Sequence, residues 1–381
     1  MNNTDLKNLI HKQKLNFSLD QEFYVNQDIF DLDIKNIFSK QWVFVGHISR
    51  IPNHGDYFLF NIGKESIIII RDNDNSVHAH YNVCRHRGSQ ICLENEGNAK
   101  VLTCPYHAWS YNLDGSLRGA RLMEKGFNKD EWHLHKCHSK IFEGLIFINL
   151  SENPNDFEEF IAPTKKFIKF HGLSDAKIAH RQYYPTNGNW KLTLDNFHEC
   201  YHCQPSHPEY CQVHDKDYII AYGAGSNTGP SSDKFDKILN DWNKKVEKMG
   251  HLTGEYTERE FNDYSRSAER TPLKEGMFTE TKSGKPASIL MGNFKDYDCG
   301  YTSVGTSPFN SLLMCNDFAT LFTFIPVNPL YTQVELMWLV HKDAEEGKDY
   351  NLEEMKWMWD VTTIADKRII EDNQKGVLSK K

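Results

Sequence analysis

The sequence predicts an α+β protein with two successive domains, an all-β domain over residues 41–150 and an α+β domain over residues 151–381. The second domain is expected to contain an antiparallel sheet flanked by helices. The length of 381 residues is sufficient for roughly two to three domains of about 150 residues each. Short β-type runs fill residues 41–150, and helical periodicity returns after Asn153-Pro154. Strands followed by a mixture of helices and strands indicate the α+β class.

A helical lead-in over residues 1–40 precedes the first domain. Apolar residues between 29 and 37 are spaced for one buried face of an amphipathic helix over 15–40. The β-type runs of the first domain are 42–46, 57–60, 66–71, 77–83, 101–104 and 141–150. The run Leu113-Asp114-Gly115-Ser116 predicts a tight hairpin turn between two of these strands.

The second domain begins with helical periodicity over 156–170 and again over 189–203. No strong period occurs over 215–300, so this polar stretch is predicted to form long connections with some helix. Strands are expected at 319–325 and 333–341, followed by a closing helix over 352–374.

Composition excludes several classes of protein. The chain has 44 Lys and Arg against 52 Asp and Glu, a net charge of −8, which argues against nucleic acid as its main partner. No run approaches the roughly 18 apolar residues of a membrane span, and the polar N-terminus lacks a signal peptide, so we expect a cytoplasmic protein without a membrane partner. Nine Cys without a secretory signal disfavour cysteine pairing and, with 18 His, favour metal binding.

Two predicted loops each supply one thiolate and one imidazole. The run Cys84-Arg85-His86-Arg87-Gly88 offers the first pair, and Cys104-Pro105-Tyr106-His107 offers the second. Such ligands bind either zinc or an iron–sulfur cluster. Zinc fingers usually take Cys pairs and His pairs from separate elements, whereas a Rieske [2Fe–2S] centre needs two thiolates on one iron and two imidazoles on the other. The mixed loops therefore favour the Rieske centre, with zinc as the alternative.

A second group of metal-binding residues lies in a predicted helix over 189–202. Asp195, Glu199 and His202 are spaced i, i+4, i+7 and are expected to share one face. Pro205 then breaks the helix, so that His207 can fold back toward His202. Two imidazoles and one carboxylate from elsewhere in the chain would make a facial triad for non-heme Fe(II).

Other interpretations of this segment stay open. Cys200 and Cys203 form a Cys-x-x-Cys pair that could bind zinc together with Cys211 and His214. Asp195 and Asn196 either lie on the helix surface or support the iron site from behind. No role is predicted for His198, which points away from the ligands, or for Cys92, which is expected to be a buried thiol.

The two Cys/His loops resemble those of the Rieske family, and specifically of Rieske oxygenase α subunits. Electron-transfer Rieske proteins of respiratory complexes carry a further Cys in each loop, whereas this chain has Ser89 and Tyr106 there. The spacing of Glu199, His202 and His207 also resembles this family. The resemblance implies Asp317 as the third iron ligand, because it directly precedes the predicted strand at 319–325. It further implies a helix-grip, START-like catalytic domain.

The resemblance assigns Glu199 as the bridge that carries electrons from His86 or His107 of a neighbouring subunit to the mononuclear iron. It therefore implies a head-to-tail homotrimer. It also implies a separate flavin- or ferredoxin-type reductase through which NAD(P)H supplies the electrons.

Glu in place of the usual Asp at the bridge position resembles a branch that acts on quaternary ammonium compounds. Segments similar to its glycine betaine monooxygenases are 272–276, 284–286, 338–341, 359–362 and 371–377. The resemblance implies oxidative N-demethylation with release of formaldehyde. The alternatives are an aromatic-ring dioxygenase or O-demethylase with the same metal sites, and an electron carrier, which the second group of metal-binding residues argues against.

Overall fold

The computed structural model describes the whole chain except residues 1–2, 15–16, 74–75, 224–228, 259–265 and 380–381. The chain divides into two compact units, Phe38–Phe157 and a second unit made of Met1–Ile37 with Glu158–Lys381. The predicted lead-in over 1–40 thus belongs largely to the second unit, and its residues 1–2 and 15–16 lie outside the described residues. The predicted boundaries at 41 and 150 stay predictions.

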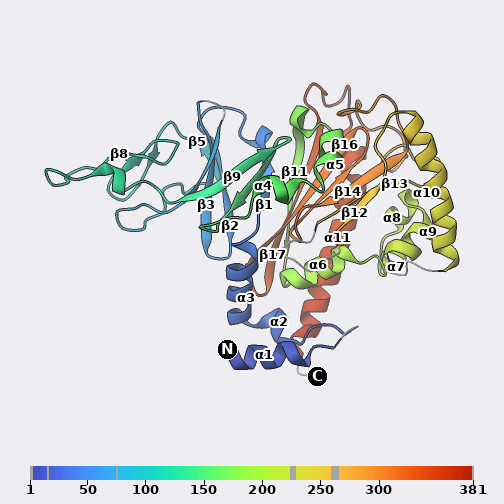
Figure 1. The fold of residues 1–381 in the computed structure, drawn as a ribbon, viewed down its shortest axis with the longest axis horizontal. Coiled ribbons are helices and arrows are strands. Elements are labelled where there is room, and N and C mark those ends of the chain that lie inside the picture. Colours follow the sequence, from blue (N-terminus) through green and yellow to red (C-terminus); the bar gives the residue numbers. More distant parts are fainter. Residues whose placement is uncertain (1–2, 15–16, 74–75, 224–228, 259–265, 380–381) are drawn as a thin grey trace. The chain divides into compact units, whose positions relative to one another are not determined.

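The first unit is all-β, as predicted (Figure 1). A seven-stranded sheet has the order β1-β10-β9-β4-β3-β2-β5, and a three-stranded sheet has the order β6-β7-β8. The strands are β1 (Val43–His47), β2 (Asp56–Ile62), β3 (Glu65–Arg71), β4 (Val77–Tyr81), β5 (Glu96–Asn98), β6 (Leu102–Thr103), β7 (Ser110–Tyr111), β8 (Leu117–Gly119), β9 (Lys136–Phe142) and β10 (Leu145–Asn149). Short helical turns occur at η2 (Ile48–Arg50) and η3 (Lys129–Glu131).

One strand prediction in this unit is wrong. The run 141–150 is not one strand, because β9 and β10 form an antiparallel hairpin that turns at Glu143 and Gly144. Both turn residues have positive φ, at 49° and 76°, and this reverses the chain. The predicted turn at 113–116 is confirmed, since Gly115 N donates to Asn112 O at 3.0 Å.

The second unit contains a seven-stranded antiparallel sheet in the order β11-β17-β16-β15-β14-β13-β12. Its strands are β11 (Ala176–Thr186), β12 (Glu255–Thr257), β13 (Ser267–Pro272), β14 (Gly300–Gly305), β15 (Asn310–Met314), β16 (Phe318–Asn328) and β17 (Tyr331–His341). The predicted strands at 319–325 and 333–341 are the central parts of β16 and β17, whose side chains are almost entirely buried.

Helices cover this sheet (Figure 1). Before the sheet come α1 (Asn3–Lys12), α2 (Glu22–Val25), α3 (Gln27–Asp33) and η1 (Ile34–Phe38), then α4 (Phe157–Ile161), α5 (Lys165–Phe170) and η4 (Leu173–Asp175). Between β11 and β12 lie α6 (Trp190–His198), α7 (Cys203–Ser206), α8 (Pro208–Val213), α9 (Lys216–Tyr218), η5 (Ile219–Gly223) and α10 (Pro230–Lys248). The closing helix is α11 (Leu352–Val377), which contacts β11, α6 and α8.

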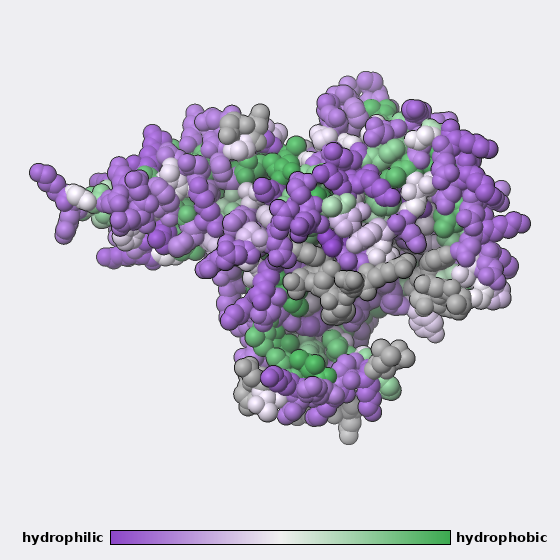
Figure 2. All heavy atoms as spheres, in the orientation of Figure 1, coloured by the Kyte–Doolittle hydropathy of each residue, from purple (hydrophilic) through white to green (hydrophobic). Residues whose placement is uncertain are grey.

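Two helix predictions need correction. The predicted helix over 156–170 is two short helices, α4 and α5, separated where Pro163 lacks a backbone N–H to continue the helix. The stretch 215–300, predicted to form long connections with some helix, contains the 19-residue α10 and also the strands β12 and β13, which the sequence did not predict. Only Phe235, Trp242 and Val246 form the buried apolar face of α10, and its outer side is hydrophilic (Figure 2), so the helical period is sparse.

None of the helices among the described residues has the length and apolar character needed to cross a membrane.

Candidate metal centres and the cavity beside them

The two Cys/His loops of the first unit fold in the same way. In the first loop Gly88 N donates to Cys84 O at 2.9 Å, and in the second Ala108 N donates to Cys104 O at 3.0 Å. Gly88 and Ala108 both have positive φ, at 76° and 58°, so each loop curls around its own cysteine. Each of these matching turns presents one thiol and one imidazole, and the two loops bring His86 and His107 side by side.

The four side chains meet the needs of a two-iron cluster. Cys84 and Cys104 are both 2% exposed, and the rings of His86 and His107 lie 4.6 Å apart. The buried Nδ1 of His107 has no hydrogen-bond partner among the described residues, as expected for a nitrogen reserved for a metal. We retain Cys84, His86, Cys104 and His107 as the predicted cluster ligands.

Tyr111 supports the first loop from within the core. Its hydroxyl lies 3.3 Å from Cys84 Sγ and accepts a 3.1 Å hydrogen bond from the backbone N of Arg85. Trp109 stacks on His86 with ring centroids 4.9 Å apart.

Cys92 is 7% exposed, and burial raises the pKa of its thiol to about 11, which confirms the prediction of a buried thiol.

In the second unit, α6 ends earlier than predicted. The helix begins at Trp190, where the Asn189 side chain accepts from Lys191 N, and it stops at His198 because Glu199 has extended backbone angles of −125° and 135°. The predicted shared helical face of Asp195, Glu199 and His202 is therefore wrong beyond His198. A disulfide between Cys200 and Cys203 closes the turn that presents His202.

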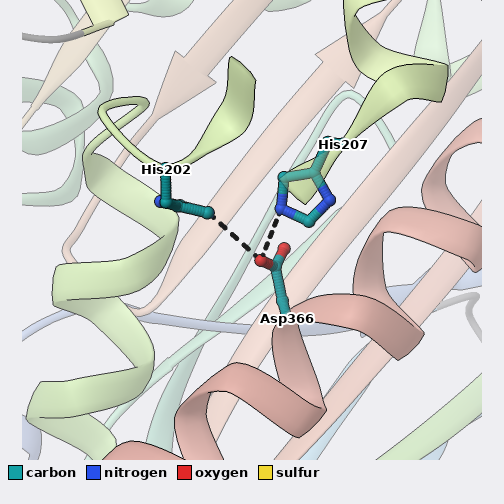
Figure 3. A group of neighbouring side chains, drawn as sticks. All are labelled: His202, His207 and Asp366. Atoms are coloured by element: carbon teal, nitrogen blue, oxygen red, sulfur yellow. Dashed lines mark hydrogen bonds and ion pairs between the residues drawn. The ribbon is translucent and has the colours of Figure 1, made fainter. Parts of the chain in front are cut away.

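His202, His207 and Asp366 offer ligand atoms that all lie within 4.8 Å of one another (Figure 3). Asp366 Oδ1 is 3.2 Å from His202 Nε2 and 2.9 Å from His207 Nε2. Burial alone would raise the pKa of Asp366, but hydrogen bonds to both imidazoles outweigh it and hold the pKa below its usual value. The same Asp366 contact, followed by Glu199, raises the pKa of His202.

Carboxylates behind the two histidines orient them. Glu199 Oε1 lies 2.8 Å from His202 Nδ1, and Glu209 Oε1 lies 3.2 Å from His207 Nδ1. A carboxylate at Nδ1 holds a proton on that nitrogen and leaves the Nε2 lone pair free for a metal. Thr362 donates to the same Glu209 oxygen at 3.0 Å. The pattern fits a divalent ion held by two Nε2 atoms and one carboxylate.

The structure does not bring Asp317 to these histidines, so its prediction as third ligand is wrong. The Asp317 carboxylate is fully occupied, since it accepts hydrogen bonds from Thr279 Oγ1, Ala287 N, Ser288 N and Tyr297 Oη at 2.7–3.3 Å. Asp317 directly precedes β16 and its carboxylate is buried among these donors, whereas Asp366 on α11 lies beside the two histidines. Asp366 and Glu209 are the two site residues that sequence reasoning missed.

A sequence signal for Asp366 exists, although it is weak. Thr362, Asp366 and Ile370 recur every four residues along α11 and therefore share one face of the helix. An acidic residue on the inward face of an amphipathic helix needs a partner, because an isolated buried charge is unfavourable. This reasoning selects Asp366, but it requires knowing which face α11 buries.

Of the two residues predicted to support the iron site, only Asn196 reaches a ligand. Asn196 Nδ2 lies 3.3 Å from His202 Nε2. Asp195 instead lines a neighbouring cavity of about 500 Å³, together with Tyr24 and Ile369, into which Glu199 and His202 also face.

The zinc interpretation of Cys200 and Cys203 is wrong, because these cysteines bond to each other. The expectation that no cysteine pairs is corrected by the same finding. Neither further residue of that interpretation supports it. Cys211 Sγ contacts the carbonyl oxygen of Cys203, and His214 is buried in a stack on Tyr210.

A partly buried ion pair anchors the start of α6 to the N-terminal segment. Lys191 pairs with Asp33, and each side chain is 12% exposed. Asp33 Oδ2 also accepts from Trp190 Nε1 at 3.1 Å. The pair thus fixes the helix whose far end presents Glu199 and His202.

Replacing Asp33 with Ala is expected to lower the unfolding free energy by about 3 kcal/mol, the lower end of the cost for a buried pair, because Lys191 is left as an uncompensated and partly buried charge. Denaturant unfolding followed by circular dichroism measures this loss. The double variant Asp33→Ala/Lys191→Met removes both charges and should recover most of it. An Asp33→Ala protein as stable as the wild type would contradict the anchoring role.

The His202–His207–Asp366 group lies on a cavity of about 940 Å³. Its walls come from α6 to α10, from α11 and from one side of β12 to β15. The aromatic side chains in its lining are Phe197, Tyr210, Tyr218, Phe235, Tyr301 and Trp359. The volume is in the range of cavities that hold small organic ligands.

Two families match the chain. Residues 41–137 match the Rieske [2Fe-2S] domain, and residues 173–381 match the catalytic domain of the ring hydroxylating alpha subunit. The glycine betaine monooxygenase oxygenase subunit of Pseudomonas aeruginosa (strain UCBPP-PA14) is 34% identical over 376 residues, which cover 97% of this chain and 85% of the relative. The carnitine monooxygenase oxygenase subunit of Escherichia coli (strain K12) is 39% identical over 199 residues, covering 51% of this chain and 53% of the relative.

Solved structures share the fold. A quaternary ammonium Rieske monooxygenase superposes with a TM-score of 0.70 at 24% identity, covering 94% of this chain and 85% of the other. Naphthalene 1,2-dioxygenase from Rhodococcus sp. gives a TM-score of 0.69 at 20% identity, covering 99% and 86%. With a Rieske domain before a ring-hydroxylating catalytic domain, and with full-length relatives above 30% identity, this chain belongs to the Rieske oxygenase α subunits.

Proposed function

We propose that this chain is the oxygenase component of a monooxygenase that oxidatively N-demethylates a quaternary ammonium substrate such as glycine betaine. The observation that carries the proposal is the convergence of His202, His207 and Asp366 on a cavity with an aromatic lining. The names of the related glycine betaine and carnitine monooxygenases support it.

The lining of the cavity suits a quaternary ammonium group. Such a group has no N–H to donate, so its recognition depends on aromatic faces and nearby negative charge, with each aromatic contact contributing about 0.5–2 kcal/mol. Tyr210, Tyr301 and Trp359 line the same cavity as the three candidate metal ligands.

The reaction balances as a monooxygenation. A substrate N-methyl group, O₂, two electrons and two protons give the N-hydroxymethyl compound and water. The C–N bond of that compound then breaks, which releases formaldehyde, the demethylated amine and one proton. When bound, the Rieske cluster would supply the electrons one at a time and the mononuclear iron would supply the activation of O₂.

Two glutamates orient the candidate iron ligands for this chemistry. Glu199 and Glu209 keep the protons of His202 and His207 on Nδ1, so that both Nε2 atoms face the metal position. The Glu199 carboxylate is 47% exposed, which leaves it accessible to a partner from outside this unit. We propose that the partner is a Rieske His of a neighbouring subunit, in a head-to-tail homotrimer.

The related quaternary ammonium Rieske monooxygenase transfers electrons between subunits, which supports this arrangement. We further propose a separate reductase that takes electrons from NAD(P)H, and a cytoplasmic location where that nucleotide pool is available. Electron transfer from purified candidate reductases to the oxidised cluster, followed by its visible spectrum, tests the reductase assignment.

A substrate panel tests the proposed function. The iron-loaded protein with a surrogate reductase is expected to release formaldehyde and consume O₂ with at least one of glycine betaine, choline, carnitine or stachydrine. His202→Ala should abolish this turnover and keep the visible spectrum of the Rieske cluster. Ring hydroxylation of simple aromatic acids without formaldehyde would contradict the proposal and favour an aromatic dioxygenase.

A further inference from the structure

The strands β12, β13 and β14 place a row of polar side chains on the cavity wall. Glu255 on β12 pairs directly with Glu269 on β13, and Glu269 pairs with Ser303 on β14. All three residues line the cavity that also contains His202, His207 and Asp366. The two carboxylates are therefore opposite each other across an antiparallel pair and face the same space.

This carboxylate pair is unfavourable without a ligand. Like charges directly opposite on neighbouring strands destabilise a sheet. Among the described residues, neither Glu255 nor Glu269 forms a salt bridge with a lysine or arginine. Burial raises the pKa of Glu269, the hydrogen bond from Tyr218 offsets part of this rise, and the charge of Glu255 adds a smaller increase. A cation in the cavity would relieve this repulsion.

Arg270 does not neutralise the pair, although it is the next residue along β13. Its guanidinium is turned to the other side of the strand, where it donates to both oxygens of Asp298 at 3.0 and 2.8 Å. Arg270 is 2% exposed and is held by Thr302 Oγ1 as well, at 3.1 Å. The described lining contains no lysine, and its arginine, Arg270, is paired with Asp298, so Glu255 and Glu269 leave this part of the cavity with net negative charge.

Aromatic hydroxyls connect Glu269 to the rest of the cavity. Tyr218 Oη donates to Glu269 Oε1 at 2.9 Å, and the Tyr301 hydroxyl lies 2.7 Å from Tyr218 Oη. Since Tyr218 gives its proton to the carboxylate, Tyr301 donates to Tyr218. Phe235 packs on Tyr218 with ring centroids 5.1 Å apart. The carboxylate is thus held in place beside aromatic faces that line the cavity.

The hydroxyl of Thr271, on the same strand as Glu269, lacks a hydrogen-bond partner among the described residues. Thr271 is two residues beyond Glu269, so both side chains lie on the cavity face of β13. Thr271 is 5% exposed, and its Oγ1 has no hydrogen-bond partner among the described residues. A buried hydroxyl is normally paired, so its position indicates that a ligand completes the site.

We infer that Glu269, held by Tyr218 and flanked by Tyr301 and Thr271, is a specificity-determining residue that binds a cationic group of the substrate. The inference rests on the proposed function, because it assigns the residues through which the same cavity selects its substrate. The carboxylate provides charge, the tyrosine rings provide faces for alkylammonium groups, and Thr271 provides a hydrogen bond to a polar substituent.

The test compares choline with 3,3-dimethylbutan-1-ol, which has the same shape with carbon in place of the charged nitrogen. Affinities for the iron- and cluster-loaded protein are measured by isothermal titration calorimetry. The wild type is expected to bind choline at least about tenfold more tightly than the neutral analogue. Glu269→Gln should reduce this ratio to about twofold or less, and Glu269→Asp should retain most of it. Glu353→Gln, the same change at an exposed position on α11, should leave the ratio unchanged.

The ratio is insensitive to general damage of the cavity, because a misshapen pocket weakens both ligands alike. An unchanged ratio in Glu269→Gln, or no preference for choline in the wild type, overturns the inference. If Glu269→Gln does not fold, the wild-type ratio together with Thr271→Val decides. Thr271→Val should weaken choline binding at least threefold, and a smaller effect overturns the inference. Failure of the proposed function is distinguishable, since it appears as wild-type protein that binds choline with the expected preference yet releases no formaldehyde from any quaternary ammonium compound.

Discussion

Replacing Asp366 with Asn is expected to remove the mononuclear iron and abolish turnover, while the Rieske cluster stays in place. The Asp366 carboxylate is the one anionic group within 4.8 Å of both His202 and His207 among the described residues. An amide keeps the shape of the side chain but removes the negative charge that a divalent ion needs from its third ligand. Metal analysis should show loss of one iron per chain, and the visible spectrum of the cluster should be unchanged.

Asp317→Asn is the matched control for this experiment. Four hydrogen bonds already occupy the Asp317 carboxylate, so this change should lower stability without removing the mononuclear iron. The two variants exchange the same atoms in aspartates of the same unit. If Asp317→Asn lost the iron and Asp366→Asn kept it, the assignment of the third ligand would be reversed.

The second large effect is expected at Glu199. Glu199→Gln should lower turnover by about a hundredfold while both metal centres stay loaded. The carboxylate holds the proton on His202 Nδ1 at 2.8 Å, and its exposed side is where the neighbouring Rieske domain is proposed to approach. The amide weakens the orientation of His202. It also removes the negative charge between His202 and the Rieske imidazole that is proposed to approach from the neighbouring subunit.

Stopped-flow absorbance of the reduced cluster measures this effect directly. On mixing with O₂ and substrate, the wild-type cluster should reoxidise quickly and the Glu199→Gln cluster slowly. Glu199→Asp is the conservative variant and should recover part of the rate. Asp195→Asn, one helical turn earlier, should have little effect because Asp195 lines the adjoining cavity rather than touching a ligand. Rapid reoxidation of the cluster in Glu199→Gln would show that electron transfer to the mononuclear iron does not depend on this carboxylate.

Local spacing was sufficient to locate most of the site. The curled loops around Cys84 and Cys104 depend on residues within six positions of each cysteine, so their pattern is readable along the chain. Glu199, His202 and His207 also lie within nine residues, and chain connectivity keeps them close in any fold. The strands β16 and β17 were predictable because their buried apolar runs are long.

The error at α6 had a different origin. Helical periodicity over 189–203 could not reveal that the chain becomes extended at Glu199, because that change depends on the turn that Cys200 and Cys203 close. Helix α10 could not be predicted because its helical period is too weak. Most residues of α10 face solvent, so its few buried side chains give too weak a period.

The sequence therefore determined that a Rieske domain precedes a catalytic domain, and it singled out the predicted cluster ligands and the two predicted iron-binding histidines, since these patterns depend on neighbours a few residues away. The third ligand, a carboxylate, could be identified only from the folded structure. Asp366 is 159 residues beyond His207, and only the packing of α11 against α6 and α8 brings them to 2.9 Å. Asp317, just before a buried strand, had the more suggestive local context, but its carboxylate already accepts four hydrogen bonds. A ligand contributed by a distant helix is chosen by the packing of that helix, and the local pattern around Asp366 does not reveal which face of α11 is packed.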